Sequence, residues 1–376
     1  MSKNILSKVL TGFMVVVLLN GCVPGNQAEN RETKATEIKE SAEGEGTSVG
    51  KEVKKPLKVG TMATVAGVPV KWALDHGYFK EQGIDVEMTI FATGAPVNEA
   101  MAAGELDIGS TGAAAIFSLA TGETMLLHEQ MSSGGMGIWV RPDSDILSAK
   151  GQIERAPEMF GSADVLKGKK IICQAGTSSE YNALRYIDSM GLTNADVELI
   201  YMDYGAGVQA FISGEGDAIA TMAPYSTQAE KEIGAVKCCT FEDATQSPLN
   251  DMIFCRREVL ETRRDDVVKY MKAIWKAIED LEDDGVRKEF SMKWFAENGR
   301  EYDEVTMDQE IADRRFVTRE DMVSGNYALG KSVVPYAEFN VQIGNLTDQQ
   351  IEKVKKSFDA TIMSEVLGTE IPVYSE

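Results

Sequence analysis

The sequence predicts an α/β protein with two lobes, each a mostly parallel sheet flanked by helices. Three observations lead to this class. A chain of 376 residues is too long for one ordinary hydrophobic core. Predicted helices alternate with short buried strands, the pattern of parallel sheets. Segments of the first half also recur in the second half, which predicts two related lobes.

The charge balance excludes several functional classes. The chain has 59 Asp and Glu residues against 38 Lys and Arg residues, a formal net charge of −21. Such a surface repels phosphates, so neither nucleic acid nor an anionic membrane surface is an expected partner of the folded body. Hydrophobic residues make up 43% of the chain, which is enough for packed cores. With only His76 and His128, we expect no His-rich metal site and no cofactor.

The N-terminus has the pattern of a lipoprotein signal peptide. Lys3 and Lys8 precede an apolar run from Val9 to Leu19, which is too short to span a bilayer. The segment Leu19-Asn20-Gly21-Cys22 resembles a bacterial lipobox. We therefore expect residues 1–21 to be removed and Cys22 to carry the lipid, palmitate included. An ordinary cleaved signal peptide with an incidental cysteine is the alternative.

A polar segment follows the expected lipidation site. Residues 22–56 contain no aromatic side chain and are rich in Glu, Lys, Gly, Ser and Thr. Such a composition cannot bury enough apolar area to offset chain entropy. We expect a disordered tether that holds the folded body away from the membrane, so that contact with the bilayer is through the lipid alone.

The internal repeat gives the order of elements in each lobe. Each unit is predicted to run strand, loop, helix, glycine turn and strand, with Gly104 and Gly214 ending the helices. Three pairs of segments align, the last more weakly: Asp85–Val97 with Asp196–Val208, Ala100–Asp107 with Ala210–Asp217, and Val59–Gly67 with Ile171–Glu180.

Open α/β sheets bind ligands beyond the carboxyl ends of their strands. The loops at these ends are rich in Gly, Ala, Ser and Thr, and two lobes with such loops facing inward would form a cleft. From these loops we expect the following ligand-binding residues: Thr61, Ala63, Thr93, Gly94, Ser110, Thr111, Gly112, Ala113, Thr177, Ser178, Ser179, Glu180, Tyr204, Pro224 and Tyr225.

Two of these loops open helices and could hold an anion. The segments 110–113 and 176–179 combine hydroxyls, glycine and free N–H groups at a helix start. Plain N-capping is the alternative for both. Glu180 could accept a ligand amine, or it could simply be a first-turn Glu on a favourable dipole. Tyr204 and Tyr225 could wall the cleft or pack in the core.

These loops contain no Arg or Lys. A sulfonate or nitrate would therefore depend on N–H dipoles, and a neutral heterocycle such as a pyrimidine precursor stays open as a ligand. Of the remaining cysteines, Cys173 and Cys255 are expected in the core, whereas the adjacent Cys238-Cys239 pair lacks metal-binding spacing. A disulfide between one of that pair and Cys255 is left open.

The chain resembles the substrate-binding proteins of bacterial ABC importers, of the nitrate, sulfonate, taurine and thiamine-precursor group. The resemblance covers residues 57–330 and is carried by the segments 57–61, 91–94, 99–112, 166–170, 176–179, 210–217 and 223–225. It implies a type-2 periplasmic-binding-protein fold with two crossovers between lobes. Hinge strands are expected near 138–140 and 252–254. Lobe 1 would hold residues 57–141 and 254–376, lobe 2 residues 164–251, and residues 142–163 form an insertion near the hinge.

The expected function is that of an extracytoplasmic, lipid-anchored, monomeric receptor. It would capture a sulfonate or a taurine-like or amino-acid-like zwitterion and pass it to an ABC permease and its ATPase. The alternative from another class is an enzyme on the same fold, such as a pyrimidine-precursor synthase or a desulfinase. That chemistry needs a reactive His or Cys in the cleft, and the predicted cleft loops contain neither.

Overall fold

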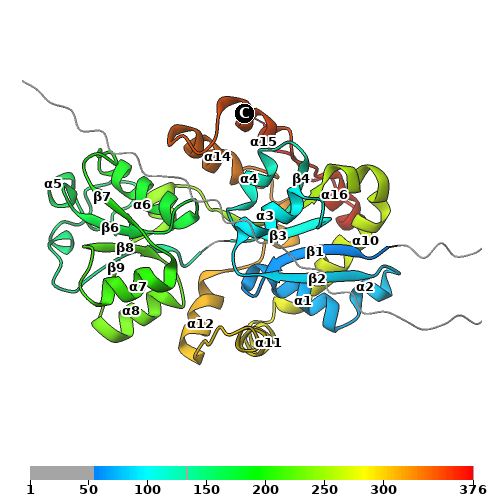
Figure 1. The fold of residues 1–376 in the computed structure, drawn as a ribbon, viewed down its shortest axis with the longest axis horizontal. Helices are drawn as coiled ribbons and strands as arrows, with labels where there is room; N and C mark the ends of the chain where they lie inside the picture. Colours follow the sequence, from blue (N-terminus) through cyan, green and yellow to red (C-terminus); the bar gives the residue numbers. More distant parts are fainter. Residues whose placement is uncertain (1–54, 133, 376) are drawn as a thin grey trace, which may run out of the picture. The chain divides into compact units, whose positions relative to one another are not determined.

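The computed structural model describes residues 55–132 and 134–375 of the chain. The predicted signal peptide, Cys22 and all of the predicted tether except its last two residues lie outside the described residues. The described part is built on two five-stranded mixed sheets flanked by helices, as Figure 1 shows. The predicted two-lobed α/β class is thereby confirmed.

The first sheet has the strand order β2-β1-β3-β10-β4. Strand β1 pairs in parallel with β2 and β3, and β10 runs antiparallel between β3 and β4. The central strands are buried, in keeping with a sheet covered on both faces. Its strands are β1 (Leu57–Met62), β2 (Val86–Phe91), β3 (Ile108–Thr111), β4 (Thr124–Ser132) and β10 (Asn250–Arg256).

The second sheet has the corresponding order β7-β6-β8-β5-β9. Strand β6 pairs in parallel with β7 and β8, whereas β5 is antiparallel to β8 and β9. Helix α6 covers one face, and α7 and α8 lie on the other (Figure 1). Its strands are β5 (Gly137–Val140), β6 (Lys170–Cys173), β7 (Glu198–Tyr201), β8 (Ala218–Thr221) and β9 (Val236–Thr240).

Helices connect the strands and extend the C-terminal part. The longest, α10, packs against α1, α2 and α16 and buries one face in the main core. None of the helices in the described part is long and apolar enough to cross a membrane. The helices between strands are η1 (Val65–Gly67), α1 (Val68–Asp75), α2 (Tyr78–Glu81), α3 (Gly94–Ala102), α4 (Ala115–Leu119), η2 (Asp145–Ser148), α5 (Ala163–Leu166), α6 (Ser178–Ser189), α7 (Tyr204–Ile212), α8 (Tyr225–Ile233) and α9 (Phe241–Thr245). Those of the C-terminal part are α10 (Arg257–Leu281), α11 (Asp284–Glu297), α12 (Glu304–Asp313), α13 (Arg319–Val323), α14 (Val333–Gln342), α15 (Asp348–Lys355) and α16 (Thr361–Leu367).

The duplicated sequence makes the same contacts in each sheet. The Lys58 N–H donates to Asp107 Oδ2 at 2.9 Å, and in the second repeat the Lys170 N–H donates to Asp217 Oδ2 at 2.8 Å. In both cases an aspartate just before the third strand ties down the start of the first strand. The aligned positions are therefore structurally equivalent.

The glycine that ends the second helix of each repeat takes the left-handed conformation. Gly104 has φ 73° and Gly214 has φ 105°, a region that favours glycine. The residue after each glycine donates its N–H to the carbonyl five residues earlier, at 2.9 Å in both repeats. This hydrogen bond satisfies a free carbonyl at the helix end.

The chain crosses between the sheets twice. It leaves the first sheet after Ser132, enters the second at Gly137, and returns at Asn250. Strand pairing places 137–140 entirely in the second sheet, although the resemblance puts residues up to 141 in lobe 1. The lobe boundaries stay a prediction, with the pairing favouring a first crossover between Ser132 and Gly137.

The segment 142–163 lies along the edge of the second sheet. The Phe160 N–H donates to the carbonyl of Cys238, a residue of the edge strand β9, at 2.9 Å. The Tyr186 hydroxyl donates to Phe160 O at 2.8 Å, which ties the segment to helix α6. This packing covers a strand edge that would otherwise expose unpaired backbone groups.

Candidate ligand-binding site

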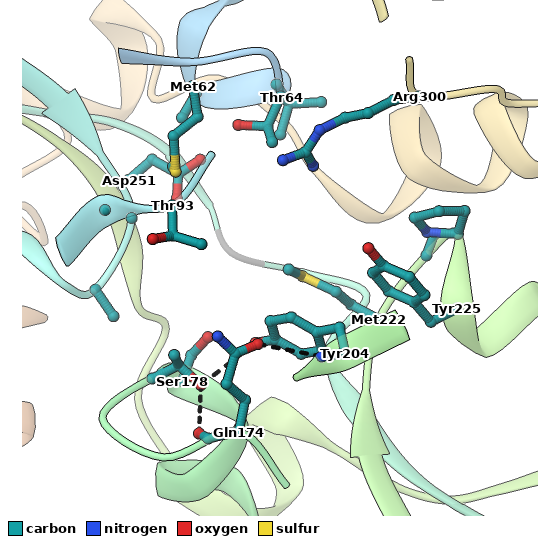
Figure 2. Close-up of a pocket in the computed structure, with 18 of the residues that line it drawn as sticks. Met62, Thr64, Thr93, Gln174, Ser178, Tyr204, Met222, Tyr225, Asp251 and Arg300 are labelled. Atoms are coloured by element: carbon teal, nitrogen blue, oxygen red, sulfur yellow. Dashed lines mark hydrogen bonds between the residues drawn. The ribbon is translucent and has the colours of Figure 1, made fainter. Parts of the chain in front are cut away.

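A cavity of about 320 Å³ lies where the loops of both sheets meet. Most of its wall is formed by residues at or just after the ends of β1, β2 and β3 of the first sheet and β6, β7 and β8 of the second. These are the carboxyl ends of the parallel strands, as the α/β rule requires. Figure 2 shows side chains from both sheets converging on this space.

The wall from the first sheet presents a helix N-terminus. Thr93 caps α3 with extended backbone, yet its hydroxyl makes no capping hydrogen bond. Gly94 begins the helix, and a Cβ at this position would lie 2.7 Å from the Cβ of Ala114. Glycine therefore lets α3 approach the loop after β3 closely, which leaves the first N–H groups of the helix beside the cavity.

The wall from the second sheet is held by a small hydrogen-bond network. The Thr177 hydroxyl donates to Gln174 O at 2.8 Å and accepts from the Ser179 N–H at 3.2 Å. Gln174 Oε1 accepts from the Tyr204 N–H at 3.3 Å (Figure 2). The Thr177 and Tyr204 hydroxyls lie 3.4 Å apart. Thr177 is thus both a helix cap and part of the cavity wall.

Aromatic and thioether side chains form the apolar part of the wall. The rings of Tyr204 and Tyr225 stack with centroids 5.6 Å apart and planes 9° apart. Met62 and Met222 extend toward the cavity from opposite sheets (Figure 2). Burial raises the pKa of Tyr204, so its phenol stays protonated and can donate a hydrogen bond.

Charged residues reach the cavity from the C-terminal part and from β10. Arg314 follows α12, and its Nη1 lies 3.0 Å from Asp251 Oδ2 while its Nε lies 3.2 Å from Glu310 Oε1. Burial opposes the charge of Arg314, but these two carboxylates raise its pKa above the ordinary value. Burial also raises the pKa of Glu310, although Arg314 counteracts the shift. Arg300 Nη2 donates to Ala92 O at 3.2 Å.

The predicted ligand-binding residues fall into two groups. One group lines the cavity: Thr93, Gly94, Gly112, Ala113, Thr177, Ser178, Tyr204, Pro224 and Tyr225. The other lies in the same loops and strand ends but is not part of the wall: Thr61, Ala63, Ser110, Thr111, Ser179 and Glu180. Ligand contact by any of them stays a prediction.

The hydroxyls of the second group are used inside the protein. Thr61 Oγ1 donates to Ser110 O at 2.8 Å, and Ser110 Oγ donates to Ala66 O at 2.9 Å. Ser179 Oγ donates to Ala220 O at 2.7 Å. These three side chains fasten the cavity loops to each other and to the strands, a role that sequence could not distinguish from ligand contact.

Glu180 lies behind the loop 174–178 and does not line the cavity. Its carboxylate accepts from the Gly176 N–H at 2.7 Å and from the Tyr201 hydroxyl at 2.8 Å. With one oxygen on each donor, Glu180 holds the loop 174–178 in place. The contact of Glu180 with a ligand amine stays a prediction.

Several lining residues were not found from the sequence. Arg300, Tyr302, Glu310 and Arg314 lie far along the chain from the loops that mark the cleft. The predicted loops contain no Arg or Lys, but the structure brings two guanidinium groups to the same cavity. No local motif marks these arginines; only the return of the chain past the hinge places them here. Other lining residues were not among the expected ligand contacts, but all of them except Gln174 and Asp251 lie in the predicted cleft loops: Met62, Thr64, Val65, Ala66, Ala92, Ala114, Gln174, Asp203, Gly205, Met222, Ala223 and Asp251.

The described cysteines and histidines are not part of the cavity wall. The four cysteines 173, 238, 239 and 255 are buried and free, so the open disulfide alternative is not realised here. Burial raises the pKa of Cys173 to about 12 and that of Cys238 to about 12, which keeps both as thiols. His128 is buried with its pKa lowered to about 3. Within residues 55–132 and 134–375, no group of metal-ligating side chains is found either.

Two sheets of corresponding strand order, with a cavity between their loops, define the periplasmic-binding-protein fold. The chain belongs to the NMT1-like family, whose sequence model matches residues 50–294. The predicted resemblance to importer binding proteins is thereby confirmed.

Relatives and solved structures are similar to this chain. A Brachyspira hyodysenteriae protein, assigned by name to the ABC transporter periplasmic binding proteins, is 29% identical over 83% of this chain and 90% of its own length. The aliphatic sulphonate binding protein SsuA of Escherichia coli has a TM-score of 0.62 at 19% identity, covering 80% of this chain and 91% of that one. The nitrate-binding protein NrtA of Synechocystis has a TM-score of 0.62 at 14% identity, covering 83% and 88%. The name of the Brachyspira relative bears out the prediction of a binding protein as opposed to an enzyme, and the two solved structures share the fold.

Proposed function

We propose that the protein is the receptor of an ABC importer and binds a small zwitterion, such as an aminosulfonate or an amino acid. One observation carries the proposal: a single cavity combines hydroxyl and N–H donors from both sheets with guanidinium and carboxylate groups. The relatives named above support the receptor class, and sulfonate and nitrate binding by the solved neighbours supports an anionic group in the ligand.

Binding would work by closure of the two lobes. A ligand that contacts loops of both sheets stabilises the closed arrangement more than the open one, and that difference shifts the population. The permease and its ATPase would recognise the closed receptor. No bond is made or broken, so the ligand should leave the receptor unchanged.

A thermal-shift screen tests the proposal. The purified protein is heated with sulfonates, amino acids, nitrate or pyrimidines, and the melting temperature is compared with that of the ligand-free protein. A ligand present at about 100 times its Kd should add roughly 2.7 kcal/mol of stability. Chemical conversion of a bound compound in stoichiometric amount would refute the receptor class.

A neutral pyrimidine precursor is the second candidate ligand. The stacked pair Tyr204–Tyr225, together with Met62 and Met222, offers an apolar surface on which a flat ring could lie. Under this alternative, pyrimidines would stabilise the protein in the screen, whereas aminosulfonates and amino acids would not.

The lipid anchor at Cys22 is also part of the proposal. Support comes from the lipobox-like segment alone, since Cys22 lies outside the described residues. With one lipidated cysteine and a polar tether, the receptor would stay at the extracytoplasmic face of the membrane. Replacing Cys22 by Ser should move the protein from the membrane fraction to the soluble fraction. A Cys22→Ser protein that stays in the membrane fraction would refute the anchor and leave the ligand proposal intact.

A further inference from the structure

Arg300 gives the cavity a cationic group that the protein itself does not neutralise. It is half-buried, follows α11, and its guanidinium points toward the cavity beside Thr64 (Figure 2). One of its N–H groups donates to Ala92 O at 3.2 Å. Within the described part of the chain, no carboxylate forms an ion pair with it. The remaining N–H groups of Arg300 are therefore available to a ligand.

The neighbouring elements add neutral donors at the same end of the cavity. Ala92, the acceptor of the Arg300 hydrogen bond, lies two residues before the start of α3. Thr93 has a hydroxyl that makes no capping hydrogen bond, and the N–H groups of the first turn of this nine-residue helix follow it. A guanidinium, a hydroxyl and a helix N-terminus together favour a carboxylate or sulfonate.

Glu310 gives the cavity a buried carboxylate that receives no hydrogen bond from the part of the protein that the structure describes. Its side chain is only 5% exposed, and no N–H or O–H of the described residues donates a hydrogen bond to its carboxylate. Arg314 Nε approaches it to 3.2 Å, but that N–H has no hydrogen-bond partner because the geometry is poor. Arg314 instead donates from Nη1 to Asp251 at 3.0 Å.

A buried carboxylate without a donor is costly, and a buried cation divided between two carboxylates does not satisfy both. A ligand ammonium group carries three N–H donors and one positive charge. An ammonium group placed beside Glu310 would donate the hydrogen bonds that the carboxylate does not receive from the described residues. Burial of Glu310 otherwise favours the protonated acid, since its pKa is raised.

We infer that Arg300, with Thr93 and the start of α3, binds the anionic group of the ligand, and that Glu310 accepts the ammonium group. The inference rests on the proposed function and assigns the two ends of the zwitterion to these residues. Selectivity then depends on two side chains that lie outside the duplicated units. Glu180, whose carboxylate already has two donors, is not required as the amine acceptor.

Matched ligands and variants test the two ends separately. Isothermal titration of the full chain uses taurine and its three-carbon homologue, each against the analogue with a hydroxyl in place of the ammonium. Taurine or its homologue should bind the wild type about tenfold or more tightly than the hydroxyl analogue. Arg300→Gln should weaken both members of a pair, whereas Glu310→Gln should weaken only the amine. Arg315→Gln, at an exposed arginine outside the cavity wall, is the control and should leave binding unchanged.

Each contrary result has one meaning. Equal binding of amine and hydroxyl analogue by the wild type overturns the role of Glu310. Unchanged affinity in Arg300→Gln overturns the role of Arg300, while the receptor proposal survives because the wild type still binds. If Glu180→Gln selectively loses amine binding and Glu310→Gln does not, the acceptor of the ligand ammonium group is Glu180 and not Glu310. If the wild type binds none of these compounds, both the inference and the zwitterion proposal fall.

Discussion

Replacing Arg314 by Met should destabilise the protein strongly. Arg314, Asp251 and Glu310 are 6%, 3% and 5% exposed, so the three charges share a nearly dry site. Met keeps much of the volume and removes the cation that lies near both carboxylates. Breaking a buried ion pair from one side typically costs about 3–5 kcal/mol, because the remaining charge is left uncompensated.

The cost should depend on pH in a defined direction. Burial raises the pKa of Glu310, and Arg314 lowers it. Without Arg314, the folded-state pKa of Glu310 rises further above the unfolded value of about 4.3. A raised folded pKa contributes stability that is present at low pH and is lost as the pH rises through that pKa. The deficit of Arg314→Met should therefore shrink on acidification, by up to about 1.4 kcal/mol per pH unit while one carboxylate titrates.

Urea unfolding of wild type and variant at pH 8 and pH 5 measures both effects. The control is Arg315→Met, the same change one residue further on. The Arg315 side chain is 71% exposed and pairs with Asp321 at the surface, so its loss should cost less than about 1 kcal/mol at either pH. A deficit of Arg314→Met that matches the control, or that grows on acidification, would refute the reasoning about buried carboxylates.

Three further predictions concern the core. Gly109→Ala places a Cβ 2.4 Å from the Phe254 ring and should cost about 1–3 kcal/mol in urea unfolding, whereas Gly205→Ala meets only an ordinary contact at 3.8 Å and should cost far less. Tyr186→Phe removes the hydroxyl that holds Phe160 O and should cost about 1–3 kcal/mol, with faster proteolysis in the segment 142–163 if that segment is released. At pH 8, a thiol reagent should label the buried cysteines only as fast as the protein unfolds; they are Cys173, Cys238, Cys239 and Cys255. Rapid labelling of any of these four cysteines in the native protein would contradict their burial.

The fold could be predicted well because its signals are local and repeated. The pattern of Ala100–Asp107, recurring at Ala210–Asp217, contains the helix, the left-handed glycine and the aspartate that ties two strands together. The helix and its terminal glycine depend on residues close in sequence, whereas the aspartate bonds to a backbone N–H 49 residues earlier in the first repeat and 47 in the second. The repeat therefore marks two sheets of the same order without any tertiary information.

The cavity was predicted only in part, for the converse reason. Loops that follow strands can be located from the strands, which gave Thr93, Thr177, Tyr204 and Tyr225. Whether a hydroxyl in such a loop faces the ligand or the protein depends on tertiary partners. Ser110 and its neighbours are turned inward by carbonyls that come from other segments of the chain.

The charged residues of the cavity were the hardest part of the site to predict from the sequence. Arg300 and Glu310 lie in a region whose sequence has only the pattern of charged helices, and the position of each is fixed by the path of the chain after it returns through β10. The absence of cations in the predicted loops argued against a small, strongly anionic ligand. Because the guanidinium of Arg300 lies in the wall and forms no ion pair within the described residues, that argument no longer applies.

The duplicated and the unduplicated parts of the chain contribute different groups to the cavity. The repeats supply two equivalent sets of helix starts, and neutral donors of this kind can hold many different polar ligands. The segment that contains Arg300, Glu310 and Arg314 lies outside both repeats, and it adds charged side chains to the cavity wall. Changes in this segment could therefore alter ligand charge preference without disturbing either sheet. An exchange of residues 298–316 with the corresponding segment of a relative should transfer ligand charge selectivity; a chimaera that keeps the original selectivity would place it in the repeats.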